Sequence, residues 1–216
     1  MPFSLENAQF IREQFPVNEH CMYLNHAAVA PWPKCTTAAV QQFAQENCIT
    51  GAQGYLSWLK KEQSLRTKLA QLVGTNDENC IALVKNTSEA LSIVAYGLDW
   101  EAGDIILISD DEFPSNRIVW ESLAQKFGVI VQQVPISAAD PEANILAAID
   151  ADNAHHNPNL KPKLISVSAV QYASGIKLDL AKLGKACKAN NVLFCVDAIQ
   201  AVGAMPFKCD EWDIDF

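Results

Sequence analysis

The run VLFCVD at 192–197 decides the fold, because it is a short and almost wholly apolar stretch that ends on an aspartate. Three more runs are built in the same way: DIILIS (104–109), VIVQQV (129–134) and KLISVSAV (163–170). Runs of Val, Ile and Leu without regular polar alternation are typical of parallel strands that helices cover on both faces. We therefore expect a mostly parallel sheet, to which CIALV (80–84) and a short strand at 22–24 also contribute.

The longer stretches between these runs carry helical patterns. Helices are expected over 5–15, 32–50 and 58–73 with Gly74 as a C-cap, then from about 88, over 115–127, after Pro141 and over 179–190. Strands that alternate with helices imply right-handed crossovers, so the predicted fold class is α/β, with three layers in the order α/β/α. The polar stretch 150–163 has the composition of a surface loop, and WDIDF (212–216) is expected to begin a further strand.

The composition indicates a folded protein with a substantial core. Of the 216 residues, 50% are hydrophobic and 19% are charged, which excludes a disordered tail or a simple coiled coil. The formal net charge of −9 argues against nucleic acid or an anionic membrane surface as the main partner. Charged and polar residues interrupt the most apolar windows, so no membrane span is predicted.

Cysteine usage and the first residues point to a cytoplasmic protein. The seven cysteines include no Cys-x-x-Cys pair, and their odd number favours reduced, mostly buried thiols: Cys21, Cys35, Cys48, Cys80, Cys187, Cys195 and Cys209. The first 15 residues lack the basic and apolar regions of a secretory signal.

Ligands of such sheets bind beyond the carboxyl ends of the strands. The first of these segments, NTSEA (86–90), opens a helix, where the hydroxyls of Thr87 and Ser88 and free N–H groups could hold a phosphate. The alternative is an ordinary helix cap, since Ser or Thr followed by Glu is a common helix start. Neither a phosphate loop of the Walker type nor G-x-G-x-x-G occurs, which disfavours an unrelated nucleotide-binding domain.

Asp197, at the end of VLFCVD, requires a partner, because an unpaired buried carboxylate is unfavourable. A protonated pyridine nitrogen would suit it, and backbone N–H groups or a nearby lysine are the alternative. Gln200, three residues later, could direct its amide at the same ligand or begin a surface helix.

Two loop aromatics and one histidine remain ambiguous. Phe113 in DEFPSN and Tyr172 in QYASG could face a planar ligand, or Phe113 could fill a local core and Tyr172 cap its loop. Asn25 and His26 follow the expected strand at 22–24 and are candidates for substrate contact, although a lone histidine is more often structural. The remaining histidines, His20, His155 and His156, lack cysteine or carboxylate neighbours at ligand spacing, so no metal site is predicted.

Five motifs occur in a recognisable order and spacing: YLNHAA (23–28), KNTSEALSIVA (85–95), GDIILISDDEFPSNRIVW (103–120), SAVQYASG (168–175) and VDAIQAVGAMP (196–206). Together they resemble the class V aminotransferase family of pyridoxal-phosphate enzymes, which includes cysteine desulfurases, isopenicillin-N epimerase-like proteins and kynureninase relatives. The resemblance extends from about residue 20 to the end of the chain.

The resemblance implies pyridoxal 5'-phosphate as cofactor and a role for each motif residue. Thr87 and Ser88 match the phosphate-binding turn, Asp197 the partner of the pyridine nitrogen, and Gln200 the partner of the ring oxygen. Phe113 stands where desulfurases carry a ring-stacking histidine, and Tyr172 where they carry an asparagine. Both departures favour the epimerase-like or kynureninase-like side of the family, because Phe can stack but cannot transfer a proton.

By family spacing, the Schiff-base lysine falls beyond Phe216, and Lys85, Lys177 and Lys208 do not match its motif, so exposed lysines are expected there. The resemblance divides the chain into an N-terminal segment (1–30) and a large cofactor-binding α/β domain (31–216), truncated at its C-terminus, with the small C-terminal domain absent. It implies a homodimer that acts on an amino acid by transamination, C–S lysis or desulfuration, or epimerisation. The chain as given is expected to be inactive alone, and the alternative is a non-catalytic homologue that serves as a binding or interaction module.

Overall fold

The computed structural model describes residues 5–137, 139–150 and 161–216. The chain divides into two compact units, Met1–Ser64 and Leu65–Phe216, and each is described by itself. Residues 151–160, which hold His155, His156 and most of the expected polar loop, lie outside the described residues. No helix in the described ranges is long and apolar enough to cross a membrane.

The first unit is helical. It contains α1 (Leu5–Glu13), the 3-10 helix η1 (Pro16–Glu19), α2 (Lys34–Thr50), the 3-10 helix η2 (Gly51–Gly54) and the start of α3 (Tyr55–Val73). The turn between α2 and α3 begins at Gly51, whose φ of +56° lies in the region that favours glycine. Trp58 then joins the two helices: its Nε1 donates to Glu46 Oε1 at 3.0 Å and its ring meets that of Phe43 edge to face. The expected helices at 5–15, 32–50 and 58–73 are therefore present with small shifts at their ends.

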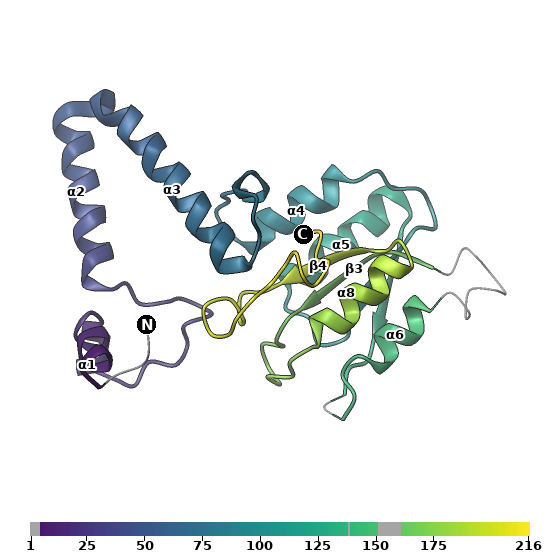
Figure 1. The fold of residues 1–216 in the computed structure, drawn as a ribbon. Coiled ribbons are helices and arrows are strands. Elements are labelled where there is room, and N and C mark those ends of the chain that lie inside the picture. The colour runs from purple at the N-terminus through teal and green to yellow at the C-terminus, as the bar shows by residue number, and fades with distance from the viewer. Residues whose placement is uncertain (1–4, 138, 151–160) are drawn as a thin grey trace. The chain divides into compact units, whose positions relative to one another are not determined.

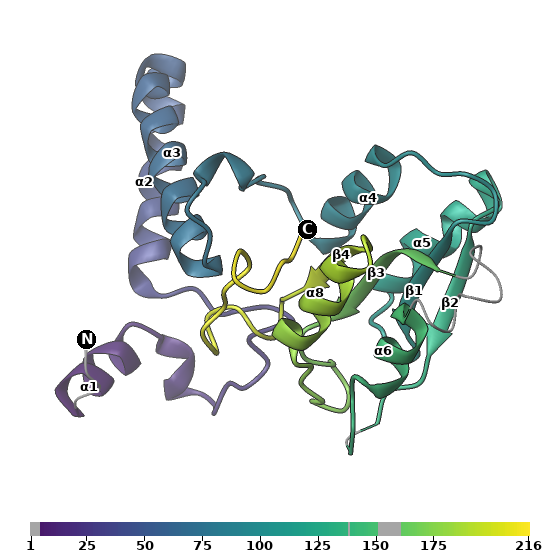
Figure 2. The same ribbon diagram turned by 45° about the vertical axis from the view of Figure 1, so that its right-hand side comes forward.

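The second unit contains a four-stranded parallel sheet in the order β2-β1-β3-β4 (Figure 1, Figure 2). Its strands are β1 (Ile105–Ser109), β2 (Ile130–Val134), β3 (Pro162–Ser168) and β4 (Leu193–Asp197), all within the four apolar runs or one residue from them. Among the described residues, the helices next to the sheet are the 3-10 helix η3 (Glu78–Cys80), α4 (Thr87–Gly97), α5 (Ser115–Phe127), α6 (Ala143–Ile149) and α8 (Leu180–Ala189).

Alternate strand residues enter two separate cores. Ile106, Ile108 and Cys195 pack with residues of α4 and α5, whereas Leu107 and Phe194 pack with residues of α6 and α8. Because successive side chains of a strand point to opposite faces, the two helix pairs cover opposite faces of the sheet. The expected three-layer α/β/α fold is confirmed.

The expected strands at 22–24 and 80–84 are wrong. Met22 and Leu24 are largely exposed, and a three-residue run forms no ladder without a neighbouring strand. At 80–84, the Asp77 side chain accepts from Asn79 N and turns the chain into η3. Ile81 then donates its N–H to Glu78 O and accepts a hydrogen bond from the Arg66 guanidinium, so both of its backbone groups are used outside a sheet.

The end of the chain runs beside β4 without forming a regular strand from residue 212. Residues 209–213 form a turn, and residues 214–216 are not part of a strand. Phe216 N donates to Phe194 O at 3.2 Å, and Val196 N donates to Phe216 O at 2.9 Å, which is the parallel hydrogen-bond pattern. The expected loop over 150–163 is also shorter at its far end, because β3 already begins at Pro162.

Candidate functional site

The carboxyl ends of β1, β3 and β4 bring polar side chains together at one edge of the sheet, and by strand alternation Ser168 and Asp197 lie on the face covered by α4 and α5. β1 ends at Ser109, β3 at Ser168 and β4 at Asp197, and all three residues are at least nine-tenths buried. Ser168 and Asp197 are direct partners in the parallel register. The rule that ligands bind at this edge of a parallel sheet makes it the candidate site.

Helix α4 begins directly after a loop, and its N-cap residue is Asn86. The Asn86 Oδ1 accepts a hydrogen bond from Glu89 N at 2.9 Å, and the Glu89 carboxylate accepts one from Lys85 N at 2.7 Å. The segment therefore does form an ordinary helix cap, as the alternative expected, but the cap residue is Asn86 and not Thr87 or Ser88. In the described part of the chain, the N–H groups of Thr87 and Ser88 have no acceptor, so they and the helix dipole can bind an anion.

Asp197 is 8% exposed, and its Oδ1 accepts a hydrogen bond of 3.0 Å from Ile199 N. Burial raises the pKa of its carboxyl; the Ile199 N–H opposes this rise and the negative charge of Glu112 adds to it. Among the described residues, no lysine or arginine pairs with Asp197, so its charge lacks the compensating cation that a buried carboxylate requires. Gln200 is half-buried in a turn after β4 and does not begin a helix.

Phe113 and Tyr172 form an aromatic pair above this edge. Phe113 lies in the loop between β1 and α5, Tyr172 lies in the turn after β3, and their ring centroids are 5.1 Å apart at 85°. Phe113 is 47% exposed and Tyr172 is 51% exposed. The interpretation of Phe113 as a local core plug is therefore wrong, since nearly half of the Phe113 side chain is exposed to solvent.

Ser88 and Phe113 line the same cavity of about 490 Å³ between α4 and α5. Tyr96 and Ser122 form part of its wall, where the Tyr96 hydroxyl lies 3.0 Å from the Ser122 Oγ. The structure thus brings together one residue of the expected phosphate turn and one of the expected stacking residues.

The sequence interpretation missed the most connected polar group of the site, Glu112. This carboxylate is 6% exposed and accepts hydrogen bonds from the ends of β1 and β3, from α5 and from the turn after β3. Its donors are Ser109 Oγ, Asn116 Nδ2, Ser168 N, Ser168 Oγ and Gln171 Nε2, at 2.6–3.0 Å. The signal in the sequence is weak: a glutamate three residues after a buried strand, with an asparagine four residues later.

Asn25 and His26 lie in the first unit, both exposed, in or next to a turn over 26–29. Nearby, the Tyr23 hydroxyl donates to Val29 O. The two candidates are therefore placed within their own unit, and their role in substrate contact stays a prediction.

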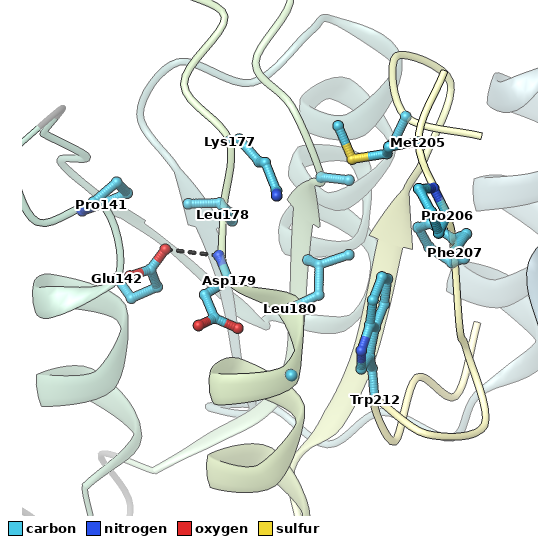
Figure 3. A pocket seen from close by; sticks show the side chains of 13 residues that line it. Pro141, Glu142, Lys177, Leu178, Asp179, Leu180, Met205, Pro206, Phe207 and Trp212 are labelled. Carbon is cyan, nitrogen blue, oxygen red and sulfur yellow. Dashed lines mark hydrogen bonds between the residues drawn. The ribbon is translucent and has the colours of Figure 1, made fainter. Parts of the chain in front are cut away.

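A second cavity, of about 480 Å³, lies on the opposite face of the sheet (Figure 3). Leu178, Leu180, Phe207 and Trp212 give it apolar walls, and the Glu142 carboxylate accepts a hydrogen bond of 2.7 Å from Asp179 N at one side. None of the residues expected to bind a cofactor lines this cavity.

The cysteines and lysines are mostly solvent-facing. Burial raises the pKa of Cys187 and of Cys195 to about 12, so these two thiols stay protonated. The expectation of mostly buried thiols is wrong, because the following cysteines are exposed on the helical first unit and on η3: Cys21, Cys35, Cys48 and Cys80. Lys85 and Lys208 are exposed and pair with Glu89 and Glu211, as expected for surface lysines, and no metal-binding cluster occurs in the described residues.

The fold and the polar edge define an α/β protein with a candidate ligand site at the carboxyl ends of a parallel sheet. The sequence model of the family described as aminotransferase class-V matches residues 22–216. The chain belongs to the aminotransferase class-V family.

Several relatives that the chain resembles carry the name cysteine desulfurase. A probable cysteine desulfurase of Pyrococcus abyssi is 29% identical over 95% of this chain and 51% of that protein. The cysteine desulfurase CsdA of Escherichia coli is 27% identical over 97% of this chain and 52% of that protein. The chain spans about half the length of the curated relatives it matches.

Solved structures show the same fold. The CsdA structure from Escherichia coli, in its S-sulfonic acid form, superposes with a TM-score of 0.80 at 25% identity, over 100% of this chain and 54% of that chain. A variant of C-DES with glycine covalently linked to its pyridoxal-phosphate cofactor gives a TM-score of 0.79 at 26% identity, over 94% and 53% of the two chains.

Proposed function

We propose that the edge formed by β1, β3 and β4 binds pyridoxal 5'-phosphate and that the protein acts on an amino acid. The observation that carries the proposal is Asp197, a buried carboxylate without a cationic partner in the described residues, at the strand end where such sheets bind ligands. Membership of the aminotransferase class-V family and the cofactor bound in the related C-DES structure support the same cofactor.

The residues present fit this cofactor. The free N–H groups and hydroxyls of Thr87 and Ser88 suit its phosphate, and Asp197 suits a protonated ring nitrogen. The exposed rings of Phe113 and Tyr172 suit a planar ring, and Gln200 lies in the turn that follows Asp197. When bound, the cofactor supplies an electron sink for bonds to the α-carbon of an amino acid.

Each residue then has a defined task. Thr87 and Ser88 fix one end of the ligand, and Asp197 keeps the ring nitrogen protonated by supplying the negative charge that this proton requires. Phe113 and Tyr172 limit the approach of water to the ring face. Phe113 carries no group that exchanges protons, so any proton transfer on that face requires a different residue.

The names of the curated relatives favour C–S bond cleavage of a sulfur amino acid over transamination or epimerisation. Because Phe113 stands where desulfurases carry a histidine, we propose C–S cleavage without a proton-transferring group at this position. We further propose that residues 31–216 form the cofactor-binding domain and that the protein is a homodimer.

Titration of the protein with pyridoxal phosphate tests the cofactor assignment. Saturable binding, with induced circular dichroism in the visible absorption of the ligand, is expected for the native protein and strong loss of affinity for Asp197→Ala. Cys187→Ala, a buried substitution on the opposite face of the sheet, serves as control and should bind normally. Absence of saturable binding to the folded native protein would refute the proposal.

A further inference from the structure

The Glu112 carboxylate joins two loops that start from different strands. Ser109 at the end of β1 and Asn116 in the first turn of α5 donate to it on one side, and Ser168 at the end of β3 and Gln171 just after that strand donate to it on the other. All five hydrogen bonds run toward Glu112, which suits a carboxylate, because this group only accepts. No lysine or arginine of the described residues pairs with it, so neutral donors alone hold its charge.

Each exposed aromatic of the site is the direct chain neighbour of a residue in this network. Phe113 follows Glu112, and its carbonyl accepts from Asn116 N at 2.8 Å while the Asn116 side chain returns to Glu112. Tyr172 follows Gln171, whose backbone closes the turn through bonds with Ile176 and Gly175. The hydrogen bond of 3.0 Å from Gln171 Nε2 to Glu112 Oε1 therefore ties together the bases of the two aromatic residues.

Gln171 shows that this arrangement is not optimised for stability alone. The residue is 1% exposed, and its Oε1 has no hydrogen-bond partner among the described residues. A buried acceptor without a donor lowers stability, and an apolar side chain of similar size would avoid this loss. Local exceptions of this kind are expected where function constrains the sequence.

From these contacts we infer that Glu112 is a positioning residue that acts through Gln171 to set the edge-to-face geometry of Phe113 and Tyr172 on the cofactor side of the sheet. That the two rings contact a cofactor rests on the proposed function, whereas the geometry of the ring pair is a property of the structure without a cofactor. Glu112 does not touch the ligand; it determines where the two rings stand.

The test uses the four tyrosines of the chain, replaced by 3-fluorotyrosine and observed by fluorine NMR without cofactor. Tyr172→Phe identifies the Tyr172 resonance, and Phe113→Leu measures how far the Phe113 ring shifts it. We expect Glu112→Gln to remove at least roughly half of this Phe113-dependent shift. The new amide NH2 group would face the hydrogen-bond donors that the carboxylate now binds, so some of these bonds would be lost. Gln171→Met is the second variant, and it is expected to give the same loss with less destabilisation because it also removes the unpartnered oxygen.

Glu142→Gln is the matched control. Glu142 is a buried glutamate, 7% exposed, that also accepts a backbone N–H, but it lies on the opposite face of the sheet. This variant should leave the Tyr172 resonance unchanged. Retention of the full Phe113-dependent shift in folded Glu112→Gln or in folded Gln171→Met would overturn the inference, and the second variant decides if the first does not fold.

Affinity for pyridoxal phosphate separates this inference from the function on which it rests. If the native protein binds the cofactor, both variants should raise Kd by roughly tenfold, because the two rings no longer stand where they meet the cofactor ring. An unchanged Kd with a displaced ring pair would overturn the role of the pair at the cofactor. If the native protein binds no cofactor, the proposed function fails, while the NMR shift still decides whether Glu112 sets the ring geometry.

Discussion

Ser168 and Asp197 face each other in the parallel register of β3 and β4, and Ser168 gives both its N–H and its hydroxyl to Glu112. Ser168 therefore connects two buried carboxylates: it donates to Glu112 and is the strand partner of Asp197. One of them, Glu112, is satisfied by five donors, whereas the carboxyl of Asp197 accepts from Ile199 N. The unequal environments suit two tasks: Glu112 holds the loops, and Asp197 is left to meet a cation.

The two carboxylates are electrostatically coupled, and Glu112→Gln should reveal this. Removal of the Glu112 charge should lower the pKa of Asp197 toward its ordinary value, although burial will still keep it raised. Carboxyl carbon NMR of Asp197 against pH measures the change. Glu142→Gln should leave the titration unaltered, and an upward shift in Glu112→Gln would contradict the coupling.

Asp197→Asn should stabilise the protein without cofactor at neutral pH. The folded pKa of Asp197 is raised above the ordinary value of 3.8, so the folded state holds this proton more tightly than the unfolded state. The free energy of unfolding of the native protein therefore falls as pH rises from 3.8 through the folded pKa. The variant does not titrate, so its advantage is complete above the folded pKa and disappears below 3.8.

We expect this advantage to be about 1 kcal/mol, which corresponds to roughly 2–4 °C in Tm for a chain of this size. Thermal unfolding at a series of pH values measures it. Equal or lower stability of Asp197→Asn at neutral pH would contradict the prediction, because it would show that the buried Asp197 charge does not lower the stability of the protein without cofactor.

The double variant Thr87→Ala, Ser88→Ala should weaken binding of pyridoxal phosphate and leave stability nearly unchanged. Asn86 caps α4, so the two hydroxyls are not needed to start the helix. Loss of two hydrogen bonds to a phosphate is expected to raise Kd by roughly 10- to 100-fold. Ser92→Ala, one turn further along α4, is the control, and an equal loss of affinity there would argue against a phosphate at the helix start.

Gly184→Ala should strongly destabilise the second unit. A Cβ at Gly184 in α8 would stand 1.7 Å from the carbonyl oxygen of Trp212, so backbone would have to move. We expect a loss of about 3 kcal/mol, which exceeds the gain of about 1 kcal/mol from the helix propensity of alanine. A Cβ at Gly97 in α4 would meet nothing within 4 Å, so Gly97→Ala should be neutral or stabilising. Denaturant titration of both variants measures the two effects.

The strands β1, β3 and β4 could be predicted because their apolar runs are largely buried, a property that local sequence records, whereas β2 is mostly exposed and was recognised from its Ile and Val residues alone. The strand expected at 80–84 fails because Asp77 turns the chain before it and Arg66 occupies the Ile81 carbonyl, and neither contact is visible in an apolar pattern. Within the site, the cap at Asn86 was one residue away from the expected position.

The Glu112 network could not be predicted for a different reason. Its donors Ser168 and Gln171 lie 56 and 59 residues further along the chain, so they meet Glu112 only when β1 and β3 pair. The resemblance marked Phe113 and Tyr172, the residues that face outward. The buried neighbours that hold them, Glu112 and Gln171, emerge only from the packed structure.

The parallel pairing of Phe216 with β4 makes the two margins of the sheet unequal. Val196 N and Phe194 O, which an open margin would offer to another polypeptide, are already bonded. In the described part of the chain, β2 is the margin that remains open, and it presents Gln132 and Gln133 to solvent. Among the described strands, β2 is therefore the margin at which another polypeptide could add a strand.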